Sequence, residues 1–330
     1  MMTKPLVDVR HLNVRFVTPE ATIHAVNGVD FSLAEGEVLA VLGESGCGKS
    51  VTLRSLIRLL PPRRTQVEGS IRIAGHDVLA LSPRELAGMR GRTVSMIFQE
   101  PMVAFDPVFT VGQQIVETIV RHEQTSRQTA HARARDLFDL VQIPSPQRRL
   151  RAYPHELSGG MRQRAMIALA LACRPRLLLA DEPTTALDAT VQIQILLLLR
   201  QLQQELGMAM IFVTHDIGVA VEVADRLAVM YAGRFVETGL VREVFRTPLH
   251  PYTAGLLAST VSRSKRGELL ETIPGSPPDL AMLPSGCSFA PRCRHVSDPC
   301  LAQSPADVAI GPTHSARCLL LEPSPSTPPT

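Results

Sequence analysis

Eight consecutive residues, Gly43 to Ser50, read Gly-Glu-Ser-Gly-Cys-Gly-Lys-Ser and fill every fixed position of the pattern G-x-x-x-x-G-K-[S/T]. The apolar run Val38–Leu42 precedes them, and the helix-like segment 50–60 follows. This order constrains the fold, because such a loop works only between a strand and the start of a helix. Its backbone N–H groups turn onto the α and β phosphates, while the lysine reaches the β and γ phosphates. The motif predicts binding of a nucleoside triphosphate.

The loop also predicts individual contacts to ATP and Mg²⁺. Lys49 is expected to bind phosphate, and the hydroxyl of Ser50 is expected to ligate Mg²⁺. Phe16 is the candidate for stacking on adenine, although an inward-facing strand phenylalanine is equally well explained as core. The residues expected to surround the nucleotide from the loop are Gly43, Glu44, Ser45, Gly46, Cys47, Gly48, Lys49, Ser50 and Val51.

Composition excludes several classes of protein. A chain of 330 residues that is 45% hydrophobic and 20% charged is long enough to bury a substantial core. It has no apolar stretch of about eighteen residues and no signal-peptide pattern at its start, so a cytoplasmic protein is expected. A net charge of +3, no Trp and three Tyr give no basic stripe or stacking platform, so nucleic acid is not an expected partner.

Periodicity predicts an α/β protein with an inserted helical part. Alternating residues at 7–16 and 31–33 predict antiparallel strands, whereas 111–122 and 126–141 carry apolar residues at helical spacing. The short apolar runs 176–181 and 208–214 are typical of parallel strands covered by helices on both faces. Beyond about residue 242 the chain is rich in proline, and its last eight residues are expected to be disordered.

Two acids end an apolar run, at Asp181 and Glu182. The carboxyl edge of a parallel sheet is where doubly wound folds place their sites. Asp181 is positioned to hold the Mg²⁺ shell, and Glu182 to polarise a water for attack on the γ phosphate. An acidic pair alone would read as a solvated turn, and the phosphate loop upstream favours the catalytic interpretation.

A second glycine-rich helix start follows at Ser158, Gly159 and Gly160. Ser158 is placed to cap the Ala-rich segment 162–173, and the glycines expose backbone N–H groups. The pattern therefore predicts a second anion site, with a simple helix cap as the alternative.

The order of these elements resembles the nucleotide-binding subunits of ATP-binding cassette (ABC) transporters over nearly the whole chain. Gln99 is similar to the family's Q-loop glutamine, which would also serve Mg²⁺, and Leu157–Met161 is similar to its signature sequence. Met161 stands where Gln is commonest, a departure familiar among peptide importers. Segment 186–188, which ends at Asp188, resembles the D-loop, and His215 resembles the γ-phosphate sensor.

This resemblance implies an ABC-type P-loop ATPase with a parallel sheet core, an antiparallel β subdomain, a helical subdomain and a C-terminal extension. We expect the ATPase core at 1–100 and 155–241, the helical subdomain at 101–154 and the extension at 242–330. The family also implies a head-to-tail pair of cassettes, in which Ser158, Gly159 and Gly160 of one subunit close on the triphosphate of the other.

The C-terminal extension narrows the resemblance. Segments 250–257 and 286–293, together with 153–156 before the signature, resemble oligopeptide and dipeptide importer ATPases. The implied cargo is short peptides, with nickel complexes or glutathione as alternatives. The implied partners are two transmembrane permease subunits contacted near segment 100–106, a related but different second ATPase, and an extracytoplasmic substrate-binding protein. The implied location is the cytoplasmic face of the cell membrane, as a peripheral subunit.

Four of the six cysteines, Cys287, Cys293, Cys300 and Cys318, lie close together in the extension. Disulfides are disfavoured in a reducing cytosol, so a metal centre or reduced structural thiols are the interpretations left open. The spacing lacks the paired C-x2-C of zinc ribbons, and some peptide-importer ATPases carry a [4Fe–4S] cluster in this extension. The resemblance therefore favours an iron–sulfur cluster, with zinc as the alternative.

Two other functions are less consistent with the sequence than a transporter subunit. A soluble cassette ATPase acting on nucleic acid or the ribosome is disfavoured because such proteins usually carry two cassettes and this chain has one. A regulatory module without turnover is disfavoured because all residues expected for hydrolysis are present.

Overall fold

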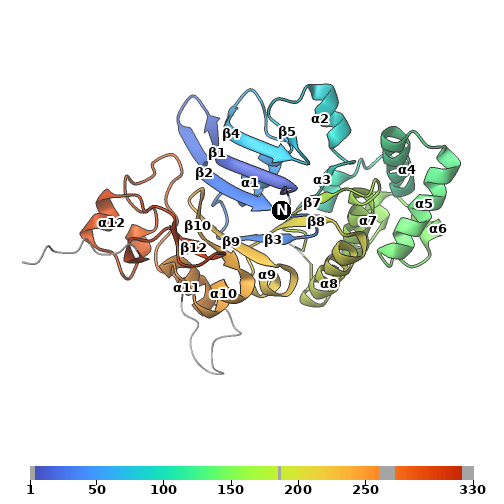
Figure 1. Cartoon of the computed structure of the whole chain (residues 1–330). Helices are drawn as coiled ribbons and strands as arrows, with labels where there is room; N and C mark the ends of the chain where they lie inside the picture. Colours follow the sequence, from blue (N-terminus) through green and yellow to red (C-terminus); the bar gives the residue numbers. More distant parts are fainter. Residues whose placement is uncertain (1–3, 185–186, 260–271, 322–330) are drawn as a thin grey trace, which may run out of the picture. The chain divides into compact units, whose positions relative to one another are not determined.

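The computed structural model describes residues 4–184, 187–259 and 272–321 (Figure 1). The chain forms two compact units. The first consists of Met1–Val7, Leu33–Val38 and Arg72–Phe212, and the second of Asp8–Ser32, Leu39–Ile71 and Val213–Thr330. Each unit therefore combines segments that are far apart in the sequence. Each also combines strands with helices, which confirms the predicted α/β class.

Buried strands form the centre of the first unit. β6 (Val94–Ile97) and β7 (Leu177–Asp181) pair in parallel, with Ile97 opposite Ala180, and β8 (Ala209–Thr214) follows β7 in the strand order. β7 and β8 are buried along their whole length, which explains why both read as continuous apolar runs. The predicted strands at 176–181 and 208–214 are confirmed.

Helices account for most of the rest of the first unit. The cap residues Thr110 and Ser126 accept hydrogen bonds from the backbone N–H groups of Gln113 and Thr129, and so begin the two helices predicted at 111–122 and 126–141. These two helices and α6 lie beside one another in Figure 1, in green. The helices are α2 (Pro83–Met89), α3 (Pro101–Ala104), α4 (Val111–Glu123), α5 (Arg127–Leu140), α6 (Pro146–Arg149), the 3₁₀ turn η1 (Pro154–Glu156), α7 (Gly159–Ala170) and α8 (Ala189–Leu206).

The second unit contains the order β2-β1-β4, formed by β1 (Val7–Val17), β2 (Thr22–Leu33) and β4 (Thr65–Ile73), and β4 pairs antiparallel with β5 (His76–Asp77). β2 begins well before the predicted 31–33. Gly28 inside it has a φ of 65°, and its N–H donates to the side chain of Asn13 at 2.9 Å. This left-handed residue interrupts the alternation and hid the first half of the strand from the sequence pattern.

The other strands of the second unit join the middle of the chain to its end. β3 (Val38–Leu42) is parallel to β9 (Arg226–Tyr231), and β10 (Arg234–Leu240) is antiparallel to β9. β12 (Ser315–Ala316) adds to β10, and β11 (Val308–Ala309) adds to β12. The helices are α1 (Lys49–Leu56), α9 (Ile217–Val223), α10 (Val241–Arg246), α11 (Pro251–Ala258) and α12 (Asp298–Ala302), with 3₁₀ turns η2 (Ala290–Arg292) and η3 (Leu319–Leu321).

One hydrophobic cluster of the second unit includes Leu42 of β3, Tyr231 of β9, Tyr252 of α11 and Phe289 of the C-terminal segment. The proline-rich end of the chain therefore shares a core with the strand that feeds the phosphate loop.

The predicted helix at 50–60 is too long, because α1 ends at Leu56. Arg58 takes a left-handed φ of 51°, and the N–H of Leu59 bonds back to the Arg54 carbonyl at 2.9 Å. This geometry closes the helix and satisfies its last carbonyls.

Within the described ranges, none of the helices combines the length and the apolar character that crossing a bilayer requires. The predicted tail 323–330 and Ala186 of the predicted D-loop lie outside the described residues.

Candidate nucleotide-binding site

The phosphate loop lies between β3 and α1, in the second unit. Gly48 precedes the first helical residue with a φ of 109°, and no side chain caps the helix. A Cβ on Gly48 would lie 2.3 Å from the Ala25 carbonyl oxygen, and one on Gly43 would lie 2.3 Å from that of Met230. Only glycine fits at either place. The start of α1 thus has no side-chain cap, which is the kind of helix terminus that can accept a phosphate group.

Lys49 is buried inside this loop. Its Nζ donates to the carbonyl oxygens of Gly43 at 2.7 Å and Glu44 at 2.9 Å. The Cys47 carbonyl accepts a hydrogen bond from the N–H of Gly233 at 2.9 Å, which ties the loop to the turn after β9. Of the other predicted loop residues, Ser45 and Gly46 are exposed, whereas Ser50 and Val51 are half-buried. The lysine is therefore held over the loop, where it would meet phosphate.

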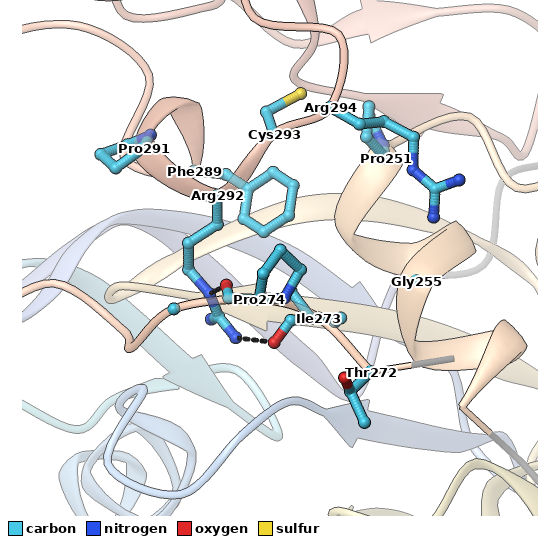
Figure 2. Close-up of a pocket in the computed structure, with 11 residues that line it drawn as sticks. Pro251, Gly255, Thr272, Ile273, Pro274, Phe289, Pro291, Arg292, Cys293 and Arg294 are labelled. Carbon is cyan, nitrogen blue, oxygen red and sulfur yellow. Dashed lines mark hydrogen bonds between the residues drawn. The ribbon is translucent and has the colours of Figure 1, made fainter. Parts of the chain in front are cut away.

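Two contacts to the loop were missed by sequence reasoning. The N–H of Glu44 donates to the Tyr252 hydroxyl at 2.9 Å, and the guanidinium of Arg292 donates to both carboxylate oxygens of Glu44, at 2.7 and 3.0 Å. Figure 2 shows Arg292 with its bonds to the carbonyls of Ile273 and Pro274. No local sequence pattern predicted these contacts, although Tyr252 lies in segment 250–257, which resembles peptide-importer ATPases.

The strand-end acids and the Q-loop glutamine lie in the first unit. β6 and β7 are neighbouring parallel strands, so their carboxyl ends lie side by side. Gln99, just after β6, donates from Nε2 to a carboxylate oxygen of Glu182 at 3.3 Å. Asp181 is fully buried at the end of β7, and Glu182 has a left-handed φ of 45°. The structure brings Gln99 and Glu182 together and aims the glutamate with a strained backbone, which is common at functional sites.

The second glycine-rich turn begins α7. Ser158 caps this helix by accepting the N–H of Met161 at 3.4 Å. A Cβ on Gly159 would come no nearer than 3.8 Å to the side chain of Leu187, and one on Gly160 would lie 3.1 Å from Val191. Ser158 therefore does act as a helix cap. That cap does not explain the two glycines, because an added Cβ at either position would not collide with backbone of the same chain.

A further glutamine fixes α7 to the strand-end acids. Gln163 is buried and donates from Nε2 to the carbonyl of Pro183, which directly follows Glu182. No sequence pattern predicted this contact, because Gln163 is one of several polar residues near the start of an Ala-rich helix. The contact joins α7, the helix that begins at the glycine-rich turn, to the backbone next to Glu182.

The remaining predicted residues occupy different kinds of position. Asp188 caps α8 by accepting the N–H of Val191 at 3.0 Å. His215 is exposed just after β8, and the next residue, Asp216, caps α9. Phe16 is half-buried in β1 and belongs to the same unit as the phosphate loop.

The four clustered cysteines lie within electrostatic reach of one another. Burial raises the pKa of Cys287, Cys293 and Cys318, and negative charge on the other three thiols raises that of Cys318 further. The N–H of Cys287 donates to the Cys300 carbonyl at 2.8 Å. Nevertheless, among residues 4–184, 187–259 and 272–321 no three His, Cys, Asp or Glu side chains are placed so that they could hold one metal ion.

A glycine-rich loop between a buried strand and an uncapped helix, together with acids at the end of a parallel strand, defines a P-loop nucleotide-binding protein. Comparison with known proteins refines this class. The ABC transporter family model matches residues 26–185, and the model of the oligopeptide/dipeptide transporter C-terminal region matches residues 236–300.

Individual relatives match over nearly the full length. A putative peptide import ATP-binding protein of Brucella melitensis is 49% identical over 97% of this chain and 98% of its own length. The oligopeptide transport ATP-binding protein OppD of Bacillus subtilis is 47% identical over 96% of this chain and 89% of its own length. A solved ATP-binding cassette, dimeric and bound to ADP and Pi, is 28% identical with a TM-score of 0.64, over 72% of this chain and 99% of that one. The chain belongs to the ABC transporter family, as the resemblance predicted.

Proposed function

We propose that this chain is the ATP-hydrolysing subunit of an importer for short peptides. One observation carries the proposal: similarity to ATP-binding proteins of peptide import extends over nearly the whole chain and includes the C-terminal region. Family membership implies ATP and Mg²⁺ as ligands. Nickel complexes and glutathione remain alternative cargoes for the same machinery.

The phosphate loop and the strand-end acids have separate roles in this proposal. Lys49 neutralises charge on the β and γ phosphates, and Ser50, Gln99 and Asp181 hold Mg²⁺, which would offset the charge that builds up on the transferred phosphoryl group. Glu182 accepts a proton from the attacking water, and its hydrogen bond with Gln99 supports this role because it orients the carboxylate. His215 senses the γ phosphate, Asp188 acts in the D-loop, and Phe16 stacks on adenine.

A second ATPase subunit completes the site in our proposal. Ser158, Gly159 and Gly160 face the triphosphate of a partner cassette, which is a related but different chain. The glycines support this arrangement, because neither is required by close backbone contact within its own subunit. A related solved cassette is dimeric with ADP and Pi, which supports the pairing of two cassettes.

Permease contact is proposed for the segment after β6, within a helical subdomain at 101–154 that interrupts an ATPase core at 1–100 and 155–241. Four large apolar side chains are exposed in this short segment, Met102, Val103, Val108 and Phe109. An exposed apolar patch of this kind marks an interaction surface. The proposed partners are two transmembrane permease subunits, which this chain would contact as a peripheral subunit at the cytoplasmic face of the membrane. An extracytoplasmic binding protein would deliver the peptide.

In the C-terminal extension, 242–330, we propose that Cys287, Cys293, Cys300 and Cys318 hold a [4Fe–4S] cluster, with zinc as the alternative. Besides burial, charge on neighbouring thiols of this group raises the pKa of Cys287, Cys293 and Cys318, so the four sulfurs are close enough to be a suitable donor set for a cross-link. The preference for the iron–sulfur cluster over zinc rests on the cysteine spacing, which lacks the paired C-x2-C of zinc ribbons. The role of the cluster would be structural.

Anaerobic purification tests the cluster. We expect iron, sulfide and visible absorption in the wild-type chain, and loss of all three in Cys318→Ser. Cys173→Ser is the matched control, since Cys173 is buried outside the C-terminal segment. Wild-type protein without iron, sulfide and colour would contradict the proposal.

The central test uses Glu182→Gln in cells that carry the assembled transporter. Uptake of labelled dipeptide, longer peptide and nickel is measured beside ATP turnover and ATP binding. Removing the general base should lower turnover by about 100-fold or more and leave ATP binding intact. Glu20→Gln, an exposed glutamate between β1 and β2, is the control. Loss of peptide uptake alone supports the proposal, loss of nickel uptake alone changes the cargo, and undiminished turnover contradicts the role of Glu182.

A further inference from the structure

Glu44, the second residue of the phosphate loop, is held on three sides. Its N–H donates to the Tyr252 hydroxyl at 2.9 Å, and its carbonyl oxygen accepts from Lys49 Nζ at 2.9 Å. Its carboxylate accepts both terminal nitrogens of Arg292, at 2.7 and 3.0 Å. Two of these three partners come from the C-terminal part of the chain. A displacement of Glu44 would move the carbonyl that holds the Lys49 ammonium.

Arg292 is buried, and all three nitrogens of its guanidinium group donate hydrogen bonds. Its side chain is only 4% exposed, and Nε donates to the Pro274 carbonyl at 2.9 Å. The guanidinium also lies over the rings of Tyr231 and Phe289, 5.8 and 6.0 Å from their centroids. The hydrogen bonds to Glu44 raise the pKa of Arg292, so it stays charged throughout the physiological range. A bidentate arginine–carboxylate pair fixes orientation as well as distance.

Tyr252 is also buried and held by contacts on several sides. Its ring is fully buried against Tyr231 and Phe289, with centroids 4.6 and 5.4 Å away. At the start of α11 its N–H donates to Nδ1 of His250 at 3.0 Å, and the N–H of His250 donates to buried Glu237 at 2.9 Å. These contacts run from Glu237 of β10 through His250 to Tyr252, and they hold the tyrosine hydroxyl beside the N–H of Glu44.

The segment that delivers Arg292 is the one that carries the thiols. Arg292 ends the turn η2, between Cys287 and Cys293, and the N–H of Cys287 donates to the Cys300 carbonyl at 2.8 Å. The fold of this segment therefore determines where the guanidinium lies, next to a cavity of about 530 Å³ lined by Ile273, Phe289 and Arg292 among others (Figure 2).

We propose that Arg292 and Tyr252 are positioning residues for ATP: by holding Glu44 they keep Lys49 and the phosphate loop in the geometry that accepts phosphate. The C-terminal segment is then part of the nucleotide-binding apparatus as well as an appendage to it. This inference rests on the proposed function, since it assumes that the loop binds ATP.

The test distinguishes two roles for these contacts: positioning the phosphate loop for ATP, or only stabilising the C-terminal segment. Three variants, Tyr252→Phe, Arg292→Lys and Arg292→Gln, are assayed in the assembled transporter for the KM of ATP, for kcat and for thermal stability. Tyr252→Phe removes only the hydroxyl, and Arg292→Lys keeps the charge but loses the fork. We expect the KM to rise about threefold, about threefold and about tenfold in that order, with kcat within about twofold of wild type. Tyr153→Phe and Arg246→Gln, both exposed, are the matched controls.

A double variant adds a readout that stability alone would not move. Because Glu44 and Arg292 act as a pair, Glu44→Gln combined with Arg292→Gln should raise the KM no more than Arg292→Gln alone. An unchanged KM in both Tyr252→Phe and Arg292→Lys, assayed well below their melting temperatures, would overturn the inference. A wild-type chain that binds no ATP would instead contradict the proposed function, so the two failures are distinguishable.

Discussion

The phosphate loop and the turn at Ser158 are both glycine-rich helix starts, yet their glycines are there for different reasons. Gly43 and Gly48 each face a carbonyl oxygen that a Cβ would meet at 2.3 Å, whereas the nearest atom to a Cβ on Gly159 is a leucine methyl at 3.8 Å. The first loop is closed around a buried lysine and has no side-chain cap. The second is capped by an exposed serine.

The difference shows that glycines in similar motifs can have different causes. A glycine can be required by close packing within its own chain, or it can leave space for another molecule. Gly43 and Gly48 of the phosphate loop are required by packing within the chain, so changing either should damage both fold and binding. In the turn at Ser158, a Cβ on Gly159 would meet only a leucine side chain, and one on Gly160 would press on Val191 at 3.1 Å, so neither glycine faces backbone. The function proposed above gives these glycines a different role, which is to let a partner cassette approach.

Gly48→Ala should give the largest effect. The methyl group must displace the Ala25 carbonyl, and alanine must adopt a φ of 109°. We expect ATP affinity to fall by about 100-fold, because roughly 3 kcal/mol of strain can be relieved only by moving the loop. Equilibrium titration with MgATP measures this.

Gly46→Ala is the control for that experiment. Gly46 has a φ of 79°, but nothing lies within 4 Å of its added Cβ, so it isolates backbone strain from collision. If Gly48→Ala binds ATP as tightly as Gly46→Ala, close packing is not what the phosphate loop requires.

Low pH should destabilise the part of the chain that packs against the phosphate loop, because that part contains the buried side chain of His250. Burial lowers the pKa of His250 to about 4 from its ordinary 6.5, so the folded chain holds this ring neutral. Its contribution to stability is complete above pH 6.5 and is lost as the pH falls towards about 4, because the unfolded chain binds the proton first. Near pH 5 the loss should be about 2 kcal/mol.

His250→Asn tests this term. Asparagine retains an oxygen that can accept the Tyr252 N–H, and it does not titrate. Urea unfolding of both proteins at neutral pH and at about pH 5 should show the smaller loss in the variant. His155→Asn, an exposed histidine just before the turn at Ser158, should behave as the wild type does.

Gly159→Ala should give the smallest effect on the isolated chain. Stability and ATP affinity should stay within about 0.5 kcal/mol of wild type, since the methyl group meets no backbone. Turnover in the assembled transporter should nevertheless fall about tenfold, because the partner's triphosphate would be held at a greater distance. Unchanged turnover would mean that this turn is only a helix cap.

Much of this protein could be predicted because its motifs follow strands. Val38–Leu42, Val94–Ile97 and Leu177–Asp181 are short apolar runs, and each delivers a polar group at its carboxyl end. The pairing of Gln99 with Glu182 follows from two such strands being neighbours. Local patterns were sufficient to predict the strands and the acids at their ends, whereas Gln99 was identified through the family resemblance and its hydrogen bond with Glu182 was found only in the structure.

The misses share one physical cause, which is that they depend on distant contacts. Arg292 and Glu44 are 248 positions apart, and no periodicity links them. The first half of β2 was missed because Gly28 gives its N–H to Asn13 and reads as a turn. Sequence patterns report a residue's neighbours along the chain, whereas these residues are determined by neighbours in space.

Cys47 has a consequence for chemical reactivity. This thiol lies inside the phosphate loop, and burial raises its pKa, so it stays protonated at neutral pH. Because alkylating reagents attack the thiolate, the ATP loop should resist them although it contains a cysteine. Covalent inhibitors designed against this residue would therefore meet an unreactive target.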